Sequence, residues 1–383
     1  MRVALLALHF AEYASRLALA LAAKHEVLLV LRPGNARDEL SDDLRAQLSR
    51  TVTLRTFEPP RKRDPRFLGA IASLNRVLRG FSPELLHVQE IHPVYSGWAI
   101  LSFRRYVPVV LTIHDHLPRE GEISKYGWKW RLRGWFRRKA SRMIVHGPRM
   151  RTELEEFDRR IAGRIEVIPH GILGCSDTEQ DISGCEPGTF LFFGRIHPYK
   201  GLRYLLEAAE LLQRRGLPLR LLIAGTGSDL DSHRARMARS PWIELIDRYI
   251  AATEVPGLFR RASAVVLPYT DATQSGVSAM AFAFARPVIA TNVGDVPEVV
   301  VDGQTGLIVP PRDSGALADA MQKLLLDRSL RDALASGAAR FARDKLSWPR
   351  IAEATDSAYR RAVDAYRQRT SITYGLSADY DEL

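Results

Sequence analysis

Residues 190–201 read FLFFGRIHPYKG, and this stretch sets the pattern for the whole chain. Its apolar run FLFF is typical of a buried strand that ends at Gly194, and the helical pattern LRYLLEAAELL follows Gly201 directly. Arg195 and Lys200 lie in the loop between the two. Such a loop can be an ordinary connection with solvated cations. It can also be an anion site, because a strand end, a helix N-terminus and fixed cations together suit a diphosphate.

Short apolar runs alternate with helical segments along the whole sequence. In the first half the runs that predict strands are VALLAL (3–8), VLLVL (27–31), ELLHVQ (84–89), PVVLTIH (108–114), RMIVHG (142–147) and IEVIPHG (165–171). In the second half they are TFLFFG (189–194), RLLIAG (220–225), IELID (243–247), AVVLPY (264–269), PVIAT (287–291) and GLIVP (306–310). Helical patterns include 14–24, 202–215, 256–262, 276–285 and 315–326. This alternation predicts an α/β protein with parallel sheets covered on both faces.

The polar segment CSDTEQDISGCEPG separates the two series of strands. We therefore expect two doubly wound, Rossmann-like domains, since 383 residues exceed one ordinary core. The expected division is a first domain over 1–172, a linker over 173–188, a second domain over 189–348, a helix over 349–370 that returns to the first domain, and a frayed tail over 371–383.

The composition is that of a soluble globular protein, with 46% hydrophobic and 26% charged residues. No apolar run reaches the roughly 18–20 residues that span a bilayer. The start, MRVALLALHF, is a strand pattern without the cleavage region of a signal peptide. Cys175 and Cys185 fit no metal-ligand spacing and are expected to stay reduced. These features favour a cytoplasmic protein.

The net charge of +11 is unevenly distributed. Residues 1–170 hold 30 basic and 18 acidic side chains, a balance of +12, whereas residues 171–383 hold 25 and 26, a balance of −1. This asymmetry predicts an anionic partner for the first half, which can be a membrane surface, a nucleic acid or a phosphorylated substrate.

Three further loops of the second half belong with the opening stretch. AGTGSDL contains Gly225 and Gly227, which let a backbone approach a ligand closely, but the third glycine of a dinucleotide site is missing. DRYIA (247–251) follows a strand, and it can be a plain connection or a loop whose backbone reads a nucleobase. Ser275 and Gly276 lie where a helix begins, a place whose free N–H groups suit phosphate. In an open α/β sheet all these loops gather at the carboxyl ends of the strands.

These loops resemble a known family. GRIHPYKG, IAGTGSDL, DATQSGV, IPHG and ARPVIATNVGDVPEVVVDGQTGLIVPPRD are similar, in order and spacing, to the retaining glycosyltransferases of family 4, glycosyl transferases group 1. The resemblance covers nearly the whole chain. It implies the GT-B fold, in which two Rossmann-like domains face a central crevice, and a nucleotide-diphosphate sugar as the donor substrate.

The resemblance also implies particular roles. Arg195 and Lys200 would hold the donor's pyrophosphate as catalytic residues, and the backbone from Ser275 to Val277 would contact phosphate. Tyr249 would lie near the base. The full set of residues assigned to the donor is Gly194, Gly225, Gly227, Tyr249, Ile250, Asp271, Gln274, Ser275, Gly276 and Val277.

The sequence departs from the family at two acidic positions. Many members carry two glutamates eight residues apart, where this chain has Ala272 and Met280. Asp271 can replace the first carboxylate or can be an ordinary turn residue. The missing pair motivates an alternative reading as a nucleotide-sugar-binding protein without catalysis.

The chemistry fits a site without a cofactor. Breaking the sugar–phosphate bond leaves negative charge on a diphosphate, which two cations and a helix N-terminus stabilise. The sequence contains no Asp-x-Asp motif, and we expect no metal. The residues are most compatible with same-face substitution, in which the leaving phosphate accepts the acceptor's proton.

The first half offers candidates for the acceptor side. His114 ends a strand and can orient a sugar hydroxyl or the acceptor, although a histidine there can also be a satisfied strand-end residue. Asp115 follows it. Glu12 and Tyr13 replace the glycine-rich turn that many members have after the first strand.

Residues 125–142, KYGWKWRLRGWFRRKASR, contain eight basic residues, three tryptophans and no acid. A helical projection places Trp128, Leu132, Trp135 and Phe136 on one face, with cations such as Arg131 and Arg138 largely elsewhere. This is the pattern of a helix at a membrane surface. The alternatives are a core-facing helix with a solvated basic face, or a nucleic-acid site, which no motif supports. Phe67, Leu68, Ile71 and Leu74 can add a second contact.

The sequence therefore predicts a peripheral enzyme on the inner face of the plasma membrane, acting on a glycan or polyprenyl-linked acceptor in bacterial-type surface polysaccharide synthesis. The alternatives are a soluble glycosyltransferase with a small acceptor and the non-catalytic binder. We expect no nucleic-acid partner.

Overall fold

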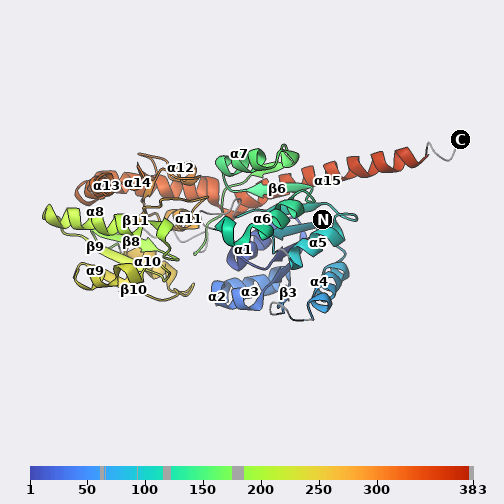
Figure 1. Cartoon of the computed structure of the whole chain (residues 1–383), viewed down its shortest axis with the longest axis horizontal. Coiled ribbons are helices and arrows are strands. Elements are labelled where there is room, and N and C mark those ends of the chain that lie inside the picture. The colour runs from blue at the N-terminus through green and yellow to red at the C-terminus, as the bar shows by residue number, and fades with distance from the viewer. Residues whose placement is uncertain (61–63, 65, 93, 115–121, 175–184, 379–383) are drawn as a thin grey trace. The chain divides into compact units, whose positions relative to one another are not determined.

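The computed structural model describes residues 1–60, 64, 66–92, 94–114, 122–174 and 185–378 (Figure 1). The chain forms two compact units. Unit 1 comprises Met1–Pro169 and Trp348–Leu383, and unit 2 comprises His170–Ser347. The chain thus leaves unit 1 once and returns to it. Most of the expected linker, 173–188, lies outside the described residues.

Unit 1 is built on a parallel sheet with the strand order β3-β2-β1-β4-β5-β6-β7. The strands are β1 (Arg2–Ala7), β2 (Glu26–Leu31), β3 (Thr53–Thr56), β4 (Leu85–Gln89), β5 (Val109–Thr112), β6 (Arg142–Val145) and β7 (Ile165–Val167). The helices are α1 (Ala11–Leu21), α2 (Pro33–Glu39), α3 (Asp42–Thr51), α4 (Phe67–Phe81), α5 (Tyr95–Phe103), α6 (Glu122–Arg137), α7 (Pro148–Phe157), the short 3₁₀ turn Arg159–Ile161, and α15 (Trp348–Ala378).

The two faces of this sheet have different covers. On one face, Leu86 and Val88 of β4 pack into a core with α4, α5 and α6, which are neighbours in that order. On the other face α1 lies beside α15, which also contacts β5 and β6. Side chains alternate along a strand, so His87 points to the face opposite Leu86 and reaches Tyr359 of α15. The returning helix is therefore part of the core of unit 1, and it continues to Ala378, through most of the expected tail.

Unit 2 repeats the doubly wound plan with the strand order β10-β9-β8-β11-β12-β13, again parallel. The strands are β8 (Thr189–Phe193), β9 (Arg220–Ala224), β10 (Ile243–Ile246), β11 (Ala264–Leu267), β12 (Val288–Thr291) and β13 (Gly306–Val309). The helices are α8 (Leu202–Arg214), α9 (Arg234–Ala238), α10 (Val255–Arg261), α11 (Gly276–Ala283), α12 (Val296–Val299), α13 (Ser314–Leu326) and α14 (Arg328–Phe341), with 3₁₀ turns at Pro198–Lys200 and Asp231–His233 and a π-helical segment at Ala342–Leu346.

The expected fold class is confirmed: both units are parallel α/β sheets, and the predicted strands all appear. One strand was missed. β3 has the sequence TLRT, and its residues are exposed or half-buried at the sheet edge, so it lacks the apolar run that marks the other strands.

Candidate active site

The strand order of unit 2 reverses between β8 and β11, which are hydrogen-bonded neighbours. At such a switch point the connections leave in opposite directions and open a ligand site at the carboxyl ends of the strands. The loop with Arg195 and Lys200 leaves β8 there, and the chain after β11 leads to the N-terminus of α11. The position of a Cβ on Gly194 would be 4.0 Å from Cγ2 of Val277, so the β8 loop lies against the first turn of α11.

Glycines bring the loops after β8 and β9 into contact. Gly225 has φ +138°, and a Cβ on it would lie 2.0 Å from the carbonyl oxygen of Gly194. A Cβ on Gly227 would lie 2.1 Å from the carbonyl oxygen of Ile196. The N–H of Gly194 also donates to Ala224 O at 3.0 Å. These two glycines therefore allow close packing of one loop on the other, a reason for glycine that the sequence interpretation, which invoked a ligand, did not include.

Lys200 is held by a buried tyrosine. Its Nζ donates to the hydroxyl of Tyr269 at 2.7 Å and lies 4.0 Å from the centre of that ring. The same hydroxyl lies 3.3 Å from Oγ of Ser275, the N-cap residue of α11. Tyr269 therefore connects the predicted pyrophosphate lysine with the predicted phosphate-binding helix. Sequence reasoning did not assign it a role.

Arg195 is exposed and forms no ion pair within the described ranges. Other arginines of unit 2 form ion pairs with carboxylates: Arg248 pairs with Glu254 at 2.5 Å, and Arg203 pairs with Glu207 at 2.8 Å. A cation without a carboxylate beside a helix N-terminus is available for an anionic ligand.

The N-terminus of α11 presents free donors. The side chain of Ser275 makes no capping hydrogen bond to the helix, and of the first three N–H groups only that of Ser278 donates to a carbonyl oxygen of the described residues, Ser275 O at 3.2 Å. Gly276 and Val277, the first two helical residues, are half-buried. This arrangement can bind a phosphate through backbone amides, as the family resemblance implies.

His170 lies next to this helix start and was not assigned from the sequence, although the IPHG motif contains it. Its Nδ1 donates to the carbonyl oxygen of Gly171 at 2.8 Å, and a Cβ on Gly276 would be 4.0 Å from its Nε2. Burial lowers the pKa of His170 to about 4, so the ring is neutral at pH 7. A neutral ring adds no charge to the anion site.

The remaining donor-side predictions have mixed positions. Tyr249 is 61% exposed after β10, whereas the side chain of Ile250 is buried in the core, so only its backbone can face a ligand. Asp271 is exposed and Gln274 is half-buried. No finding tests the roles assigned to these residues, and they stay predictions.

The positions of the missing glutamates belong to the core. Ala272 is buried within the core of unit 2, and Met280 is half-buried and packs against the same cluster. The chain has therefore not replaced the two carboxylates with other polar groups at these positions.

In unit 1 the carboxyl ends of the central strands hold a buried polar cluster. Phe10 after β1 and Glu90 after β4 have φ values of 59° and 58°, which non-glycine residues rarely adopt. The Glu90 carboxylate accepts from the N–H of Ile91 at 2.9 Å and from the N–H of His114 at 3.0 Å. Strained backbone held by buried hydrogen bonds is a feature of functional sites.

His114 lies at the centre of this cluster. Its Nε2 is 3.0 Å from Oε1 of Gln89, and its Nδ1 is 3.1 Å from Nε2 of His146. The carbonyl of Ile168 can only accept, so His146 donates to it from Nδ1 at 3.0 Å and, when neutral, presents a lone pair to His114. Both ring nitrogens of His114 thus have protein partners, and a bond to a sugar hydroxyl would replace one of them.

The other acceptor-side candidates differ in exposure. Tyr13 is buried with its ring edge-on to His114 at 5.1 Å between centres, and burial raises the pKa of its hydroxyl. Glu12 pairs with Arg16 at 2.8 Å on α1. Asp115 lies outside the described residues. Roles in acceptor binding stay predictions for all of these residues.

The single aromatic face predicted for residues 125–142 is wrong in part. Phe136 is buried, Leu132 packs against the same core, and a Cβ on Gly97 of α5 would be 2.5 Å from the Phe136 ring. Leu74 of α4 is buried as well. Phe136 and Leu132 face the core because α6 covers the sheet, which favours the core-facing alternative for that side of the helix.

Part of the basic segment does face outward. Trp135 is 38% exposed with Nζ of Lys139 5.0 Å from its ring centre, and Arg131 is exposed. Arg138 is instead paired with Asp158 at 3.1 Å. The side chain of Trp128 lies outside the described residues.

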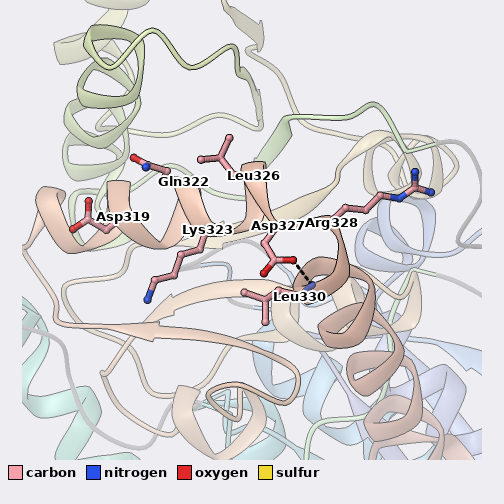
Figure 2. A pocket seen from close by; sticks show the side chains of 7 residues that line it. All are labelled: Asp319, Gln322, Lys323, Leu326, Asp327, Arg328 and Leu330. Carbon is pink, nitrogen blue, oxygen red and sulfur yellow. Dashed lines mark hydrogen bonds between the residues drawn. The ribbon is translucent and has the colours of Figure 1, made fainter.

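Two other features of unit 2 lie away from the loops described above. A groove of about 820 Å³ between α13 and the start of α14 is lined mainly by polar side chains (Figure 2).

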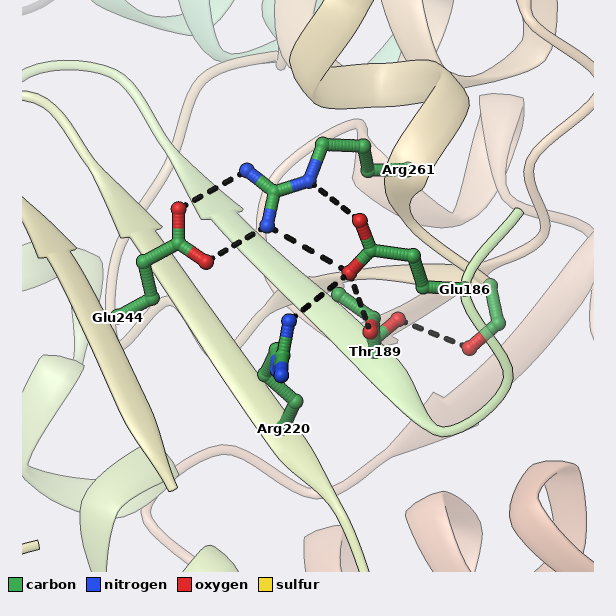
Figure 3. A network of polar contacts seen from close by, with 6 residues as sticks. Glu186, Thr189, Arg220, Glu244 and Arg261 are labelled. Atoms are coloured by element: carbon green, nitrogen blue, oxygen red, sulfur yellow. Dashed lines mark hydrogen bonds and ion pairs between the residues drawn. The ribbon is translucent and has the colours of Figure 1, made fainter. Parts of the chain in front are cut away.

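The second feature is a network around Arg261, which bonds to Glu186 at 2.7 Å and to Glu244 at 2.6 Å, beside the amino ends of β8 and β9 (Figure 3). The Arg261 hydrogen bonds lower the pKa of both carboxyl groups. This network ties strand ends together on the edge of the sheet opposite the site.

Within the described ranges no group of His, Cys, Asp and Glu side chains is suited to hold a metal ion. Among the same residues no helix is long and apolar enough to cross a membrane.

Comparison with known proteins agrees with this architecture. Residues 187–327 match the family described as glycosyl transferases group 1, and residues 11–172 match glycosyltransferase family 4. Glycogen synthase of Mycobacterium tuberculosis (strain H37Rv) is 29% identical over 307 residues, covering 76% of this chain and 72% of the relative. D-inositol 3-phosphate glycosyltransferase of Arthrobacter sp. (strain FB24) is 29% identical over 314 residues, covering 75% of this chain and 74% of the relative.

Solved structures share the fold. Anabaena HepE, in complex with UDP and glucose, superposes with a TM-score of 0.69 at 17% identity, over 93% of this chain and 98% of its own. Sucrose-phosphate synthase of Thermosynechococcus elongatus superposes with a TM-score of 0.73 at 18% identity, over 95% of this chain and 100% of its own.

The two doubly wound sheets and these relatives define a glycosyltransferase with the GT-B fold. More particularly, the chain belongs to glycosyltransferase family 4, the glycosyl transferases of group 1. It is therefore a transferase that uses a nucleotide sugar.

Proposed function

We propose that the anion site of unit 2 binds the diphosphate of a nucleoside diphosphate sugar, and that the sugar is transferred with retention of its anomeric configuration. The observation that carries this proposal is the arrangement at the start of α11. Arg195 is a cation without a carboxylate partner in the described ranges, and Lys200 is fixed 2.7 Å from the hydroxyl of Tyr269, next to Ser275. These groups converge on one helix N-terminus.

The step needs charge stabilisation more than it needs a base. The bond between the anomeric carbon and the phosphate oxygen breaks, and a bond from the acceptor oxygen forms on the same face of the sugar. The acceptor's proton passes to the leaving phosphate, so the atoms balance without a protein base. Arg195, Lys200 and the α11 amides stabilise the charge that develops on the diphosphate, and one such donor contributes on the order of 3 kcal/mol to lowering the barrier.

This mechanism uses protein cations where other transferases use a metal ion, and we propose that activity is independent of Mg²⁺ and Mn²⁺. Support comes from the two cations, Arg195 and Lys200, because protein cations near a diphosphate can neutralise its charge as a metal ion would. The nucleobase of the donor would lie at Tyr249, whose exposed ring follows β10 at the same edge of the sheet. Since HepE is solved with UDP and with UDP-glucose, uridine diphosphate is the first probe to test.

We propose a glycan or polyprenyl-linked acceptor at an anionic membrane surface, as in bacterial-type surface polysaccharide synthesis. The balance of +12 over residues 1–170 supports this. So do exposed apolar side chains on the neighbouring helices α4, α5 and α6: Leu68 is 65% exposed, Trp98 48% and Trp135 38%. Aromatic and apolar side chains among cations suit an interface with anionic lipid.

A soluble acceptor is the second candidate, and a specific observation favours it. One relative is named for a small phosphorylated acceptor, D-inositol 3-phosphate, and another is named for glycogen synthesis. The core-facing position of Phe136 and Leu132 also reduces the apolar surface that α6 can offer to lipid. In this case the basic residues of unit 1 would contact a phosphorylated acceptor instead.

Nucleotide release separates these readings. Purified protein is incubated with UDP-, GDP- and ADP-sugars, first alone and then with a lipid-linked or a soluble phosphorylated acceptor. We expect release from one donor, and at least a hundredfold loss of rate in Arg195→Ala, since a transition-state donor is removed. Arg214→Ala is the matched control, because Arg214 is an exposed arginine at the far end of α8. Equal rates in the two variants would remove the assignment of Arg195 to the diphosphate.

A further inference from the structure

Tyr269 occupies the centre of the proposed diphosphate site without being a charged group. Its hydroxyl lies between Lys200 Nζ at 2.7 Å and Ser275 Oγ at 3.3 Å, and its ring lies under the ammonium. It thereby links the loop after β8 to the N-cap of α11 through one side chain. Lys200 is 69 positions from Tyr269 in the sequence, and Tyr269 is 6 positions from Ser275, so the fold brings Lys200 to the other two residues.

The tyrosine itself is fixed. It is among the largest fully buried side chains of the described residues, with 1% of its surface exposed. Thr291 Oγ1 donates to its carbonyl oxygen at 2.6 Å, and the N–H of the next residue, Thr270, donates to Tyr199 O at 2.8 Å. The second bond ties the chain after β11 directly to the loop that carries Lys200. A rigid phenol therefore fixes the end of a flexible lysine side chain.

One hydrogen bond of this group has a defined direction. An ammonium can only donate, so the oxygen of Tyr269 accepts from Lys200. The hydroxyls of Tyr269 and Ser275 are within hydrogen-bond distance, and either can donate to the other. The side chain of Ser275 does not cap α11. The group thus places one ammonium and one hydroxyl at the start of the helix.

We propose that Tyr269 is a positioning residue for the diphosphate: it holds the Lys200 ammonium in place at the N-terminus of α11. This inference rests on the proposed function, and it adds a residue to that site. Ser275, which lies beside the hydroxyl of Tyr269, is 7% exposed. Tyr269 acts through Lys200 and does not need to touch the ligand.

The test is a double-mutant cycle on binding rather than on activity. Dissociation constants are measured by calorimetry for UDP, with GDP, ADP and inorganic pyrophosphate as parallel probes, at one salt concentration. The proteins are the wild type, Tyr269→Phe, Lys200→Met and the double variant. Phenylalanine keeps the ring under the ammonium and removes only the hydroxyl. Tyr204→Phe is the control, because the hydroxyl of Tyr204 on α8 has no hydrogen-bond partner among the described residues.

We expect Tyr269→Phe to weaken binding of the preferred diphosphate about tenfold, as for a hydrogen bond to a charged group. In the Lys200→Met background the same change should have an effect of about twofold or less, because the tyrosine then has no ammonium to hold. A purely structural role of the hydroxyl would give the same loss in both backgrounds and would overturn the inference. So would Tyr269→Phe binding as tightly as wild type, with Tyr204→Phe unchanged.

The outcome also separates this inference from the proposed function. A wild type that binds none of the four probes overturns the diphosphate site itself, and the role of Tyr269 with it. A wild type that binds one of them, with additive effects of Tyr269→Phe and Lys200→Met, leaves the site in place and removes only the positioning role. Thermal melts of each variant show whether the fold survives, and a melt of Tyr269→Phe unchanged from wild type assigns the lost affinity to the site.

Discussion

His87 is expected to make unit 1 sensitive to acid. The side chain is fully buried, with Nδ1 2.6 Å from the hydroxyl of Tyr359 and Nε2 2.7 Å from Oγ1 of Thr112. Burial lowers its pKa from 6.5 to about 3. As the pH falls below 6.5, His87 becomes protonated in the unfolded chain but stays neutral in the folded chain. Stability is therefore lost on acidification and is fully present only above the unfolded-state pKa.

The size of the loss follows from the two pKa values. At pH 5 protonation of His87 stabilises the unfolded state by RT ln(1 + 10^1.5), about 2 kcal/mol. In the folded state the same histidine stays almost entirely unprotonated, so protonation contributes almost no stabilisation there. We expect wild-type unit 1 to lose about this much free energy of unfolding between pH 7.5 and pH 5 through His87 alone. In His87→Gln the difference between the two pH values should shrink by about 2 kcal/mol, because glutamine does not titrate.

The assay is urea unfolding followed by tryptophan fluorescence at the two pH values. Five of the six tryptophans, Trp98, Trp128, Trp130, Trp135 and Trp348, belong to unit 1, so the signal reports mainly on that unit. Tyr359→Phe is the matched control. It removes a hydrogen-bond partner but keeps the histidine, so it should lower stability at both pH values and leave the difference between them unchanged. An equal pH difference in wild type and His87→Gln would refute the reasoning.

Four further predictions concern unit 2 and helix α6. Gly225→Ala should lower the melting temperature and abolish nucleotide binding measured by calorimetry, because the added Cβ would lie 2.0 Å from Gly194 O; full binding by a stable variant would show that the two loops can separate. Nucleotide release should persist in EDTA, and an absolute requirement for Mg²⁺ or Mn²⁺ would contradict the role given to Arg195 and Lys200. Trp135→Ala should reduce co-sedimentation with anionic vesicles without changing donor affinity, whereas equal pelleting on neutral and anionic vesicles would favour the soluble acceptor. Binding to those vesicles should also fall steeply with salt, since each cation near the surface contributes about 1 kcal/mol over a Debye length of about 8 Å.

The sequence was informative wherever a pattern is local. Apolar runs such as FLFF and VALLAL mark buried strands, because both faces of a parallel sheet are covered. β3 was not predicted, because an edge strand with exposed residues needs no apolar run. The linear order of motifs likewise indicated which loops of unit 2 meet, since parallel strands place their carboxyl ends on one edge.

What the sequence could not supply was the partner of each side chain. Tyr269 reads as one more aromatic residue after a strand, and only the packed loops show that its hydroxyl lies 2.7 Å from Lys200. The helical projection of residues 125–142 treated all apolar residues as one surface. It could not show that Phe136 covers Gly97 and the core, whereas Trp135 faces outward. Periodicity locates a stripe, but the neighbouring helices decide whether that stripe is covered.

The packing around Ala272 and Met280 restricts how this enzyme can be re-engineered. A glutamate at the buried position of Ala272 would put a carboxylate into the packed cluster, where an unpaired charge costs several kcal/mol, and a glutamate at the half-buried Met280 would replace a side chain that packs against the same cluster. Neither substitution alone would supply a partner for the charge. A route back to the two-glutamate site would thus pass through poorly folded intermediates. Substitutions at the exposed residues Tyr249 and Asp271 would instead leave that packed cluster intact.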